Sequence, residues 1–174
     1  MKLPKGQASG LLTERTQHGL NPGPLALLSR TSIMYPTLTK DDTLYFTGLG
    51  GIHRSVFTSN GYGEIEKLGD SINSGPAAHP FIAPDESYLI FDGRDRSDGF
   101  GGWDLYISFR RPDGLWTKAK NMGKEINSNA NELCPSVSPD GKYLFYESSR
   151  NDDVMNIYWA DAKIIRDLRP KELN

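Results

Sequence analysis

The sequence predicts an all-β fold in which related antiparallel sheets follow one another along the chain, as the blades of a β-propeller do. A pattern anchored on a proline occurs three times, and the anchors Pro36, Pro80 and Pro135 lie 44 and 55 residues apart. An aspartate stands five residues after each proline, and a run of aromatic and aliphatic residues follows each aspartate. A four-stranded unit that repeats every ~40–50 residues is typical of propeller blades.

The segments between the repeats are also related. Residues 67–74 (KLGDSINS) match residues 121–128 (NMGKEINS), which lie 54 residues further along the chain. Short stretches with an aromatic residue precede them, at 62–65 and 115–118, and we interpret these as the fourth, outermost strands of two blades. The sequence therefore predicts one propeller domain over 31–174, with blades at about 31–74, 75–128 and 129–161.

The third repeat shows most clearly how the residues determine the elements. Pro135–Ser138 is expected to be extended, because a residue at or before proline is pushed towards β conformations. Pro139–Gly141 is expected to form a tight turn, since proline presets φ and glycine accepts a positive φ. The aromatic run Lys142–Glu147 and the run Asn156–Ala160 then predict two further strands, separated by the polar loop Ser148–Asp153.

The remaining segments depart from this pattern. Residues 1–30 do not fit the repeat and are predicted to be irregular, although the apolar run 24–28 is interpreted as a strand of a neighbouring blade. The first repeat has Lys40-Asp41-Asp42 in place of Pro-Asp-Gly, and its turn is one residue shorter. The second repeat carries a long loop at 93–103. The third repeat has no fourth strand, and residues 162–174 predict a short amphipathic helical turn and a polar tail.

Composition excludes several classes of protein. The chain of 174 residues has a net charge of −2 and a pI of about 5.9, which does not point to nucleic acid. Its single cysteine, Cys134, excludes an intramolecular disulfide. No apolar stretch is long enough to predict a membrane span. The first residues lack the apolar core of a secretion signal, so we expect a protein that stays inside the cell or lacks its native N-terminus.

The third repeat resembles the TolB-type, WD-like β-propeller repeat. The likeness rests on Ser138-Pro139-Asp140-Gly141 followed by Leu144-Phe145, Ser149-Arg150 and Ile157-Tyr158, and it covers about residues 31–161. The linker 68–74 and the ending Asp161–Ile165 are similar to a subset of these proteins. Members usually have six or seven blades and act in the cell envelope as binding partners, or lie beside or within peptidases and polysaccharide lyases. The resemblance therefore implies a periplasmic or envelope location if the native N-terminus is missing.

Three blades cannot close a ring, because each blade buries apolar faces against both of its neighbours. Large exposed apolar patches are unusual on soluble monomers. We therefore expect either that the chain is the C-terminal part of a longer propeller, or that two copies pair about a two-fold axis into a six-blade ring.

No motif predicts catalysis, a metal or a cofactor. The chain has no His-x-x-x-His, Cys-x-x-Cys, Gly-x-Ser-x-Gly or Walker sequence. Four aspartates lie in or beside the long loop, at Asp92, Asp95, Asp98 and Asp104. They do not predict a calcium loop, because the order of ligands is wrong and no glutamate closes the loop. Cys134 is expected to start an inner strand rather than to act as a nucleophile.

The candidate binding residues lie in the interblade loops and in the loops between second and third strands, which form one face of a propeller. They are Arg94, Arg96, Trp103, Glu132, Arg150 and His79. For Arg94 and Arg150 we expect instead that they pair with neighbouring acids and brace the blades, and for His79 that it is a packed or loop histidine. The sequence favours a non-enzymatic binding propeller that recognises a protein or a cell-envelope glycan through this loop face. The alternatives are a fragment of a propeller-type enzyme whose catalytic residues lie outside this chain, and a remnant without independent function.

Overall fold

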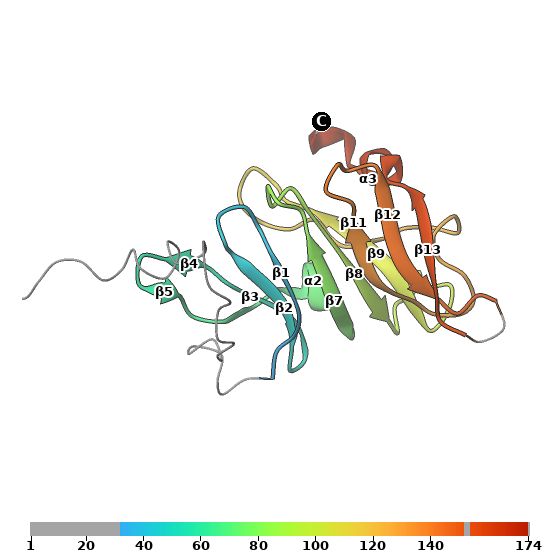
Figure 1. Ribbon diagram of the computed structural model, residues 1–174, viewed down its shortest axis with the longest axis horizontal. Coiled ribbons are helices and arrows are strands. Elements are labelled where there is room, and N and C mark those ends of the chain that lie inside the picture. The colour runs from blue at the N-terminus through green and yellow to red at the C-terminus, as the bar shows by residue number, and fades with distance from the viewer. Residues whose placement is uncertain (1–31, 152–153, 174) are drawn as a thin grey trace, which may run out of the picture.

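The computed structural model describes residues 32–151 and 154–173 of the chain. The strand predicted at 24–28 lies outside these residues. The described part is all-β apart from three short helical segments, and its three main antiparallel sheets stand side by side (Figure 1). No helix among the described residues has the length and apolar character needed to cross a membrane.

Each sheet corresponds to one repeat. Within a sheet, the first strand in the sequence is the innermost and the last is the outermost. The first blade consists of β1 (Met34–Leu38), β2 (Leu44–Gly48), β3 (Gly51–Ser55) and β6 (Glu66–Lys67). Between β3 and β6 the chain forms a separate hairpin of β4 (Phe57–Thr58) and β5 (Gly61–Tyr62), which projects away from the other sheets (Figure 1). The second blade consists of β7 (Ala77–Ile82), β8 (Tyr88–Arg94), β9 (Trp103–Phe109) and β10 (Lys120–Asn121).

The third blade is a three-stranded sheet in the described residues. It contains β11 (Glu132–Val137), β12 (Tyr143–Ser148) and β13 (Asn156–Asp161), and then the helix α3 (Lys163–Leu168) and the 3-10 turn η2 (Lys171–Leu173). The innermost strand of each blade lies against the blade before it, so that β7 contacts β1, β2 and β3, and β11 contacts β7, β8 and β9. Two apolar clusters fill these two interfaces.

The fourth strands were predicted too early in the sequence. The structure places them at β6 and β10, just after the predicted stretches 62–65 and 115–118. Part of the predicted stretch 115–118 still pairs with the third strand of its blade, because Trp116 bridges Arg110 and the Thr117 N–H donates to the Phe109 carbonyl at 2.9 Å. Trp116 stands edge-on to Tyr45 with ring centroids 6.3 Å apart, and Tyr62 belongs to the separate β4–β5 hairpin. The stretch 115–118 thus pairs with the end of β9 just before β10, whereas Tyr62 pairs with Phe57 inside its own hairpin.

The segment predicted to be extended after Pro135 lies in β11 as far as Val137, but the residue before each anchor proline departs from the regular strand conformation. Tyr35, His79 and Cys134 have φ angles of 53°, 47° and 53°, in the left-handed region. The register of each inner strand shifts at this point, which marks a β-bulge. At His79 and Cys134 the bulge frees the backbone N–H from its own sheet, and this N–H donates to a side chain of the preceding blade.

The repeated linkers fix the third strand of each blade. The linker of the first blade forms the short helix α2 (Asp70–Asn73), which the sequence pattern did not predict. Asn73 accepts a hydrogen bond from the Ile52 N–H at 2.9 Å and donates to the Ile52 carbonyl at 3.0 Å. Asn127 makes the same pair of bonds with Leu105, at 2.7 and 3.0 Å. The asparagine therefore extends the sheet as a strand would, which explains why Ile-Asn-Ser recurs.

Candidate functional site

The interblade linkers and the β8–β9 loop lie at one end of the blades, as expected for a loop face. The structure separates the six predicted binding residues into different environments. Arg94 and Trp103 lie together at the surface, Arg96 and Arg150 are held between aromatic rings, Glu132 is buried, and His79 lies on an inner strand.

Arg94 and Trp103 are directly opposite each other on β8 and β9. The guanidinium carbon of Arg94 lies 5.0 Å from the centre of the Trp103 ring. The Arg94 side chain is about half exposed, and its Nε lies 3.6 Å from Asp95, an exposed and therefore weak ion pair. Phe100 in the same loop is half exposed. These residues form a mixed aromatic and cationic patch, which we call the Arg94–Trp103 patch.

Arg96 and Arg150 hold equivalent places in the second and third blades. The guanidinium of Arg96 lies 4.6 Å from the centre of the Tyr106 ring and donates to the carbonyl of Ile72. The guanidinium of Arg150 lies 4.9 Å from the Tyr158 ring and donates to the carbonyl of Ile126. Each arginine thus ties the strands of its own blade to the linker before it. This geometry makes both of them braces, the role expected for Arg150.

Glu132 is the centre of a buried polar cluster at the start of the third blade. Its carboxylate accepts hydrogen bonds from the backbone N–H and hydroxyl of Ser128, at 2.8 and 2.7 Å, and from the hydroxyl of Ser148 at 2.7 Å. Arg150 adds an ion pair of 3.4 Å. With its acceptor sites occupied and its side chain fully buried, Glu132 is not accessible to a ligand in this structure.

The β8–β9 loop is exposed but is held in place by specific contacts. A Cβ atom on Gly101 would lie 2.1 Å from the Ala130 carbonyl oxygen, so only glycine fits there. Gly102 donates to the same carbonyl at 2.8 Å, and the Asp104 carboxylate accepts the Phe100 N–H at 2.6 Å. The contacts with Ala130 thereby attach the loop to the linker between the second and third blades. Across residues 32–151 and 154–173, no group of three or more His, Cys, Asp or Glu side chains is arranged to hold a metal.

His79 belongs to a network that joins the blades near their inner strands. Its Nδ1 lies 2.7 Å from Oδ1 of Asp92, whose carboxylate is fully buried. Burial alone would lower the pKa of His79, but hydrogen bonds to Asp92 and Cys134 and the charge of Asp92 raise it to about 10. The pairing with Asp92 thus favours the protonated form of the imidazole. The sequence analysis did not identify Asp92 as its partner, although Asp92 occupies the same repeat position as Thr47.

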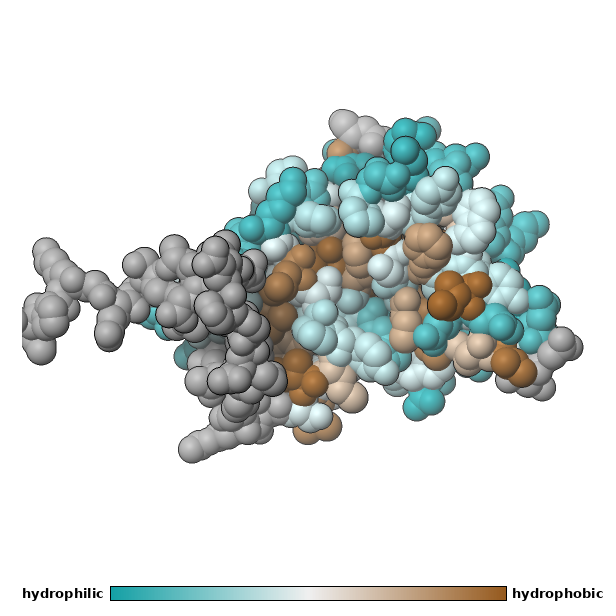
Figure 2. All heavy atoms as spheres, viewed as in Figure 1, coloured by the Kyte–Doolittle hydropathy of each residue, from teal (hydrophilic) through white to brown (hydrophobic). Residues whose placement is uncertain are grey.

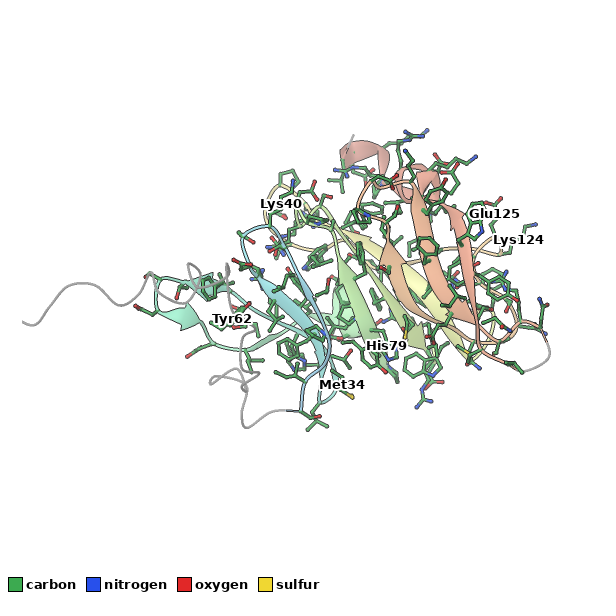
Figure 3. The ribbon with its side chains drawn as sticks, viewed as in Figure 1. Met34, Lys40, Tyr62, His79, Lys124 and Glu125 are labelled. Carbon is green, nitrogen blue, oxygen red and sulfur yellow. The ribbon has the colours of Figure 1, made fainter. Side chains whose placement is uncertain are left out.

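The three pre-proline steps line a cavity of about 330 Å³ between the inner strands. Its walls are the Tyr35–Thr37, His79–Phe81 and Cys134–Ser136 segments of the three blades. Figure 3 shows Met34 and His79 on the neighbouring strands β1 and β7. The ring of Tyr35 stands edge-on to that of His79, with centroids 3.9 Å apart. The cavity is thus lined by aromatic, proline and small side chains and by His79, which is paired with Asp92.

A larger groove, which the sequence did not predict, opens at the opposite end of the blades. It measures about 690 Å³ and lies between the Gly141 turn, the ends of β8 and β9, and α3. Its cationic residues are Lys142, Lys163, Arg166 and Arg169, and its aromatic ones are Tyr88, Phe109, Tyr143 and Trp159. Asp161 is the one acid among the lining residues that the structure describes, and these residues together carry a net positive charge on an acidic protein. We call it the basic groove.

The fold defines the class of protein: three antiparallel blades packed face to face form a β-propeller segment. No known family's model matches the sequence, and no curated protein matches it. Among solved structures, TolB from Acinetobacter baumannii matches 76% of this chain and 30% of its own chain, at 20% identity and a TM-score of 0.50. A TolB candidate from Agrobacterium tumefaciens matches 78% of this chain and 60% of its own, at 15% identity and a TM-score of 0.41.

The described chain therefore has the fold of the propeller region of a TolB protein, as the repeat pattern predicts. It spans less than a third of the length of the Acinetobacter protein and 60% of that of the Agrobacterium protein. At this level of identity the similarity concerns the fold alone.

Proposed function

We propose that this chain is a non-enzymatic binding module that holds a protein partner through the Arg94–Trp103 patch of its loop face. The observation that carries the proposal is the stacked Arg94–Trp103 pair, with the guanidinium 5.0 Å from the ring centre. Of the six candidate residues, these two are the pair whose side chains are not committed to bracing the blades or to the buried networks.

The chemistry of the patch favours a protein over a sugar. Tryptophan and arginine are the residues most enriched among interface positions that contribute much of the binding free energy. The register of β8 and β9 holds both side chains before any partner arrives, so less conformational entropy is lost on binding. Phe100 adds apolar area within the same loop.

Site-specific photo-crosslinking tests this proposal. A photoreactive phenylalanine analogue replaces Trp103, and the labelled protein is irradiated in an envelope extract of the source organism. We expect a discrete crosslinked product that weakens when Arg94→Ala is added. The matched control carries the analogue at Leu115, which is exposed on the second blade away from the patch. Identical products from both positions, or a product indifferent to Arg94→Ala, would refute a specific patch.

The basic groove supports a second candidate, an acidic glycan. Among residues 32–151 and 154–173, neither Lys163 nor Arg166 forms an ion pair, so both are available to a carboxylate. Trp159 and Tyr143 offer ring surface against which a sugar can stack. An array of acidic and neutral saccharides tests this idea. We expect binding restricted to acidic ones and weakened by Lys163→Ala with Arg166→Ala, but not by Lys118→Ala on another surface.

A further inference from the structure

The two interfaces between blades use the same hydrogen bond. The backbone N–H of His79 donates to the Thr47 hydroxyl at 2.9 Å, and the N–H of Cys134 donates to the Asp92 carboxylate at 3.1 Å. Thr47 and Asp92 hold the same position in the second strand of their blades, and the donors are the pre-proline residues of the next blade. We call this bond the interblade latch.

The third blade carries the acceptor half of a latch, and no blade follows it among the described residues. Glu147 occupies in β12 the position of Thr47 in β2 and Asp92 in β8, because all three follow the aligned Leu-aromatic run by the same number of residues. No hydrogen bond of the Glu147 side chain occurs within the described part of the chain. The carboxylate is thus available to accept a backbone N–H.

The apolar residues around Glu147 are exposed where their counterparts are buried. Ile157 lies opposite Glu147 just as Leu105 lies opposite Asp92, yet Ile157 is 77% exposed and Leu105 0%. Trp159, the counterpart of Ile107, is 63% exposed against 0%. Tyr143 and Phe145 belong to the same exposed face, which we call the forward face of the third blade. Figure 2 shows apolar residues at the surface in the region of β13.

The first blade carries the matching donor half. The step Tyr35-Pro36 in β1 is equivalent to His79-Pro80 in β7, and Tyr35 shares the left-handed φ of the two donors. Leu38 is 44% exposed, whereas its counterpart Ile82 in β7 is 1% exposed. Met34, Tyr35 and Pro36 are exposed as well, and with Leu38 they form what we call the leading edge of β1.

We propose that a second copy of this chain covers the forward face, with its β1 lying across β12 and β13 and its Tyr35 N–H bonded to Glu147. The occupant is a second copy because this chain itself presents both halves of the repeated contact, at opposite ends of the row of blades (Figure 1). Two copies related by a two-fold axis satisfy both contacts at once and leave neither half unused.

The contact is confined to the inner part of the first blade. Its other apolar residues, Leu44 and Phe46, are already buried with Ile33, Tyr62 and Ile65 packed against them. The pair of chains therefore buries less surface than two full blade interfaces, and small interfaces dissociate readily. We expect a monomer–dimer equilibrium with a dissociation constant on the order of 10 µM.

Sedimentation equilibrium over a concentration series tests the association. We expect the wild-type chain to dimerise, and Trp159→Asp or Leu38→Asp each to raise the dissociation constant at least tenfold. Leu115→Asp, equally exposed but on neither surface, should leave the constant unchanged. Should either variant fail to fold by circular dichroism, Ile157→Asp and Met34→Asp replace it. A wild-type chain that stays monomeric to 200 µM, or variants that dimerise as well as the wild type, would overturn the proposal.

Disulfide trapping tests the head-to-tail geometry. Leu38→Cys and Trp159→Cys variants are mixed under mild oxidation, and the bridges are mapped by mass spectrometry so that Cys134 can be retained. The proposal requires the 38–159 bridge to form at least tenfold faster than the 38–38 or 159–159 bridge. A dominant 159–159 bridge would show forward faces packed against each other and would overturn it. Neither measurement involves the Arg94–Trp103 patch, so the binding function proposed for that patch stands or falls separately. Trp159 also lines the basic groove, and the glycan candidate is therefore tested through Lys163 and Arg166, which neither measurement changes.

Discussion

The second and third blades each present an apolar face on the side away from the first blade, but only one of these two faces is covered. Leu105 and Ile107 on β9 are fully buried beneath the third blade, whereas their counterparts Ile157 and Trp159 on β13 are exposed. The residues have similar apolar character, so their burial depends on whether another blade lies against them. In this fold the stabilising free energy resides mainly between blades, since each sheet depends on its neighbour to cover one face.

The largest expected effect compares these two faces directly. Leu105→Ala removes buried methyl groups from the filled interface and should lower the free energy of unfolding by about 3 kcal/mol. Ile157→Ala, at the same register on the open face, should change it by less than about 0.5 kcal/mol. Urea unfolding of the monomer at low concentration measures both. Equal losses at the two positions would mean that the forward face is covered within the monomer.

The interblade latch allows the same comparison with polar residues. Asp92→Asn removes the charge that pairs with His79 and weakens the acceptor of the Cys134 N–H, and should cost about 2 kcal/mol. Glu147→Gln, at the equivalent unlatched position, should cost almost nothing in the monomer. The unfolding midpoints of the two variants measure the difference. If Asp92→Asn were as mild as Glu147→Gln, the latch would contribute little to holding the blades together.

Arg150 and Arg94 allow a comparison between an arginine that braces a blade and one that is proposed to bind a partner. Arg150→Ala removes a guanidinium held by two rings and a linker carbonyl, and leaves Glu132 without its cation, for an expected loss of about 1.5 kcal/mol. Arg94→Ala, on an exposed stacked pair, should cost less than about 0.5 kcal/mol. Thermal unfolding of both variants separates the roles. A larger loss for Arg94 would reverse the assignment of brace and binding residue.

The last comparison concerns the dependence of stability on pH. The folded chain holds the pKa of His79 at about 10, against an unfolded value of about 6.5, so the folded state binds more protons between these values. The contribution of this pair to stability is therefore complete below about pH 6.5 and is lost as the pH rises towards 10. His79→Gln should flatten this part of the stability profile, as urea titrations across the range would show. An unchanged slope would exclude His79 as its source.

The sequence predicted the blades because strand, turn and linker chemistry recur along the chain. The Leu-aromatic runs became β2, β8 and β12, and the helical turn expected in the tail became α3. The bulge at Tyr35, His79 and Cys134 was not predictable from proline alone, because proline disfavours the right-handed helical region but does not specify the left-handed one. At His79 and Cys134 the neighbouring blade supplies the acceptor for the freed N–H, and that contact is not visible in the local sequence.

The candidate site was predictable only in part for a similar reason. The sequence places Arg94, Arg96 and Arg150 in or beside the equivalent loops of the second and third blades. It does not predict which aromatic rings they contact, because those contacts depend on how β8 pairs with β9 and β12 with β13. The basic groove unites the ends of two blades with α3, so its residues are scattered through the sequence. Asp92 shows what comparing repeats position by position can add, since its alignment with Thr47 marks it as an interface residue.

Amide hydrogen exchange at the three pre-proline residues tests the central claim, that equivalent blades are latched side by side. In the monomer at low concentration, the N–H groups of His79 and Cys134 should exchange at the slow rate of the sheet interior, because side chains of the preceding blade accept them. The N–H of Tyr35, which has the same backbone geometry but no preceding blade in the described chain, should exchange orders of magnitude faster. Comparable fast exchange at all three positions would contradict the account.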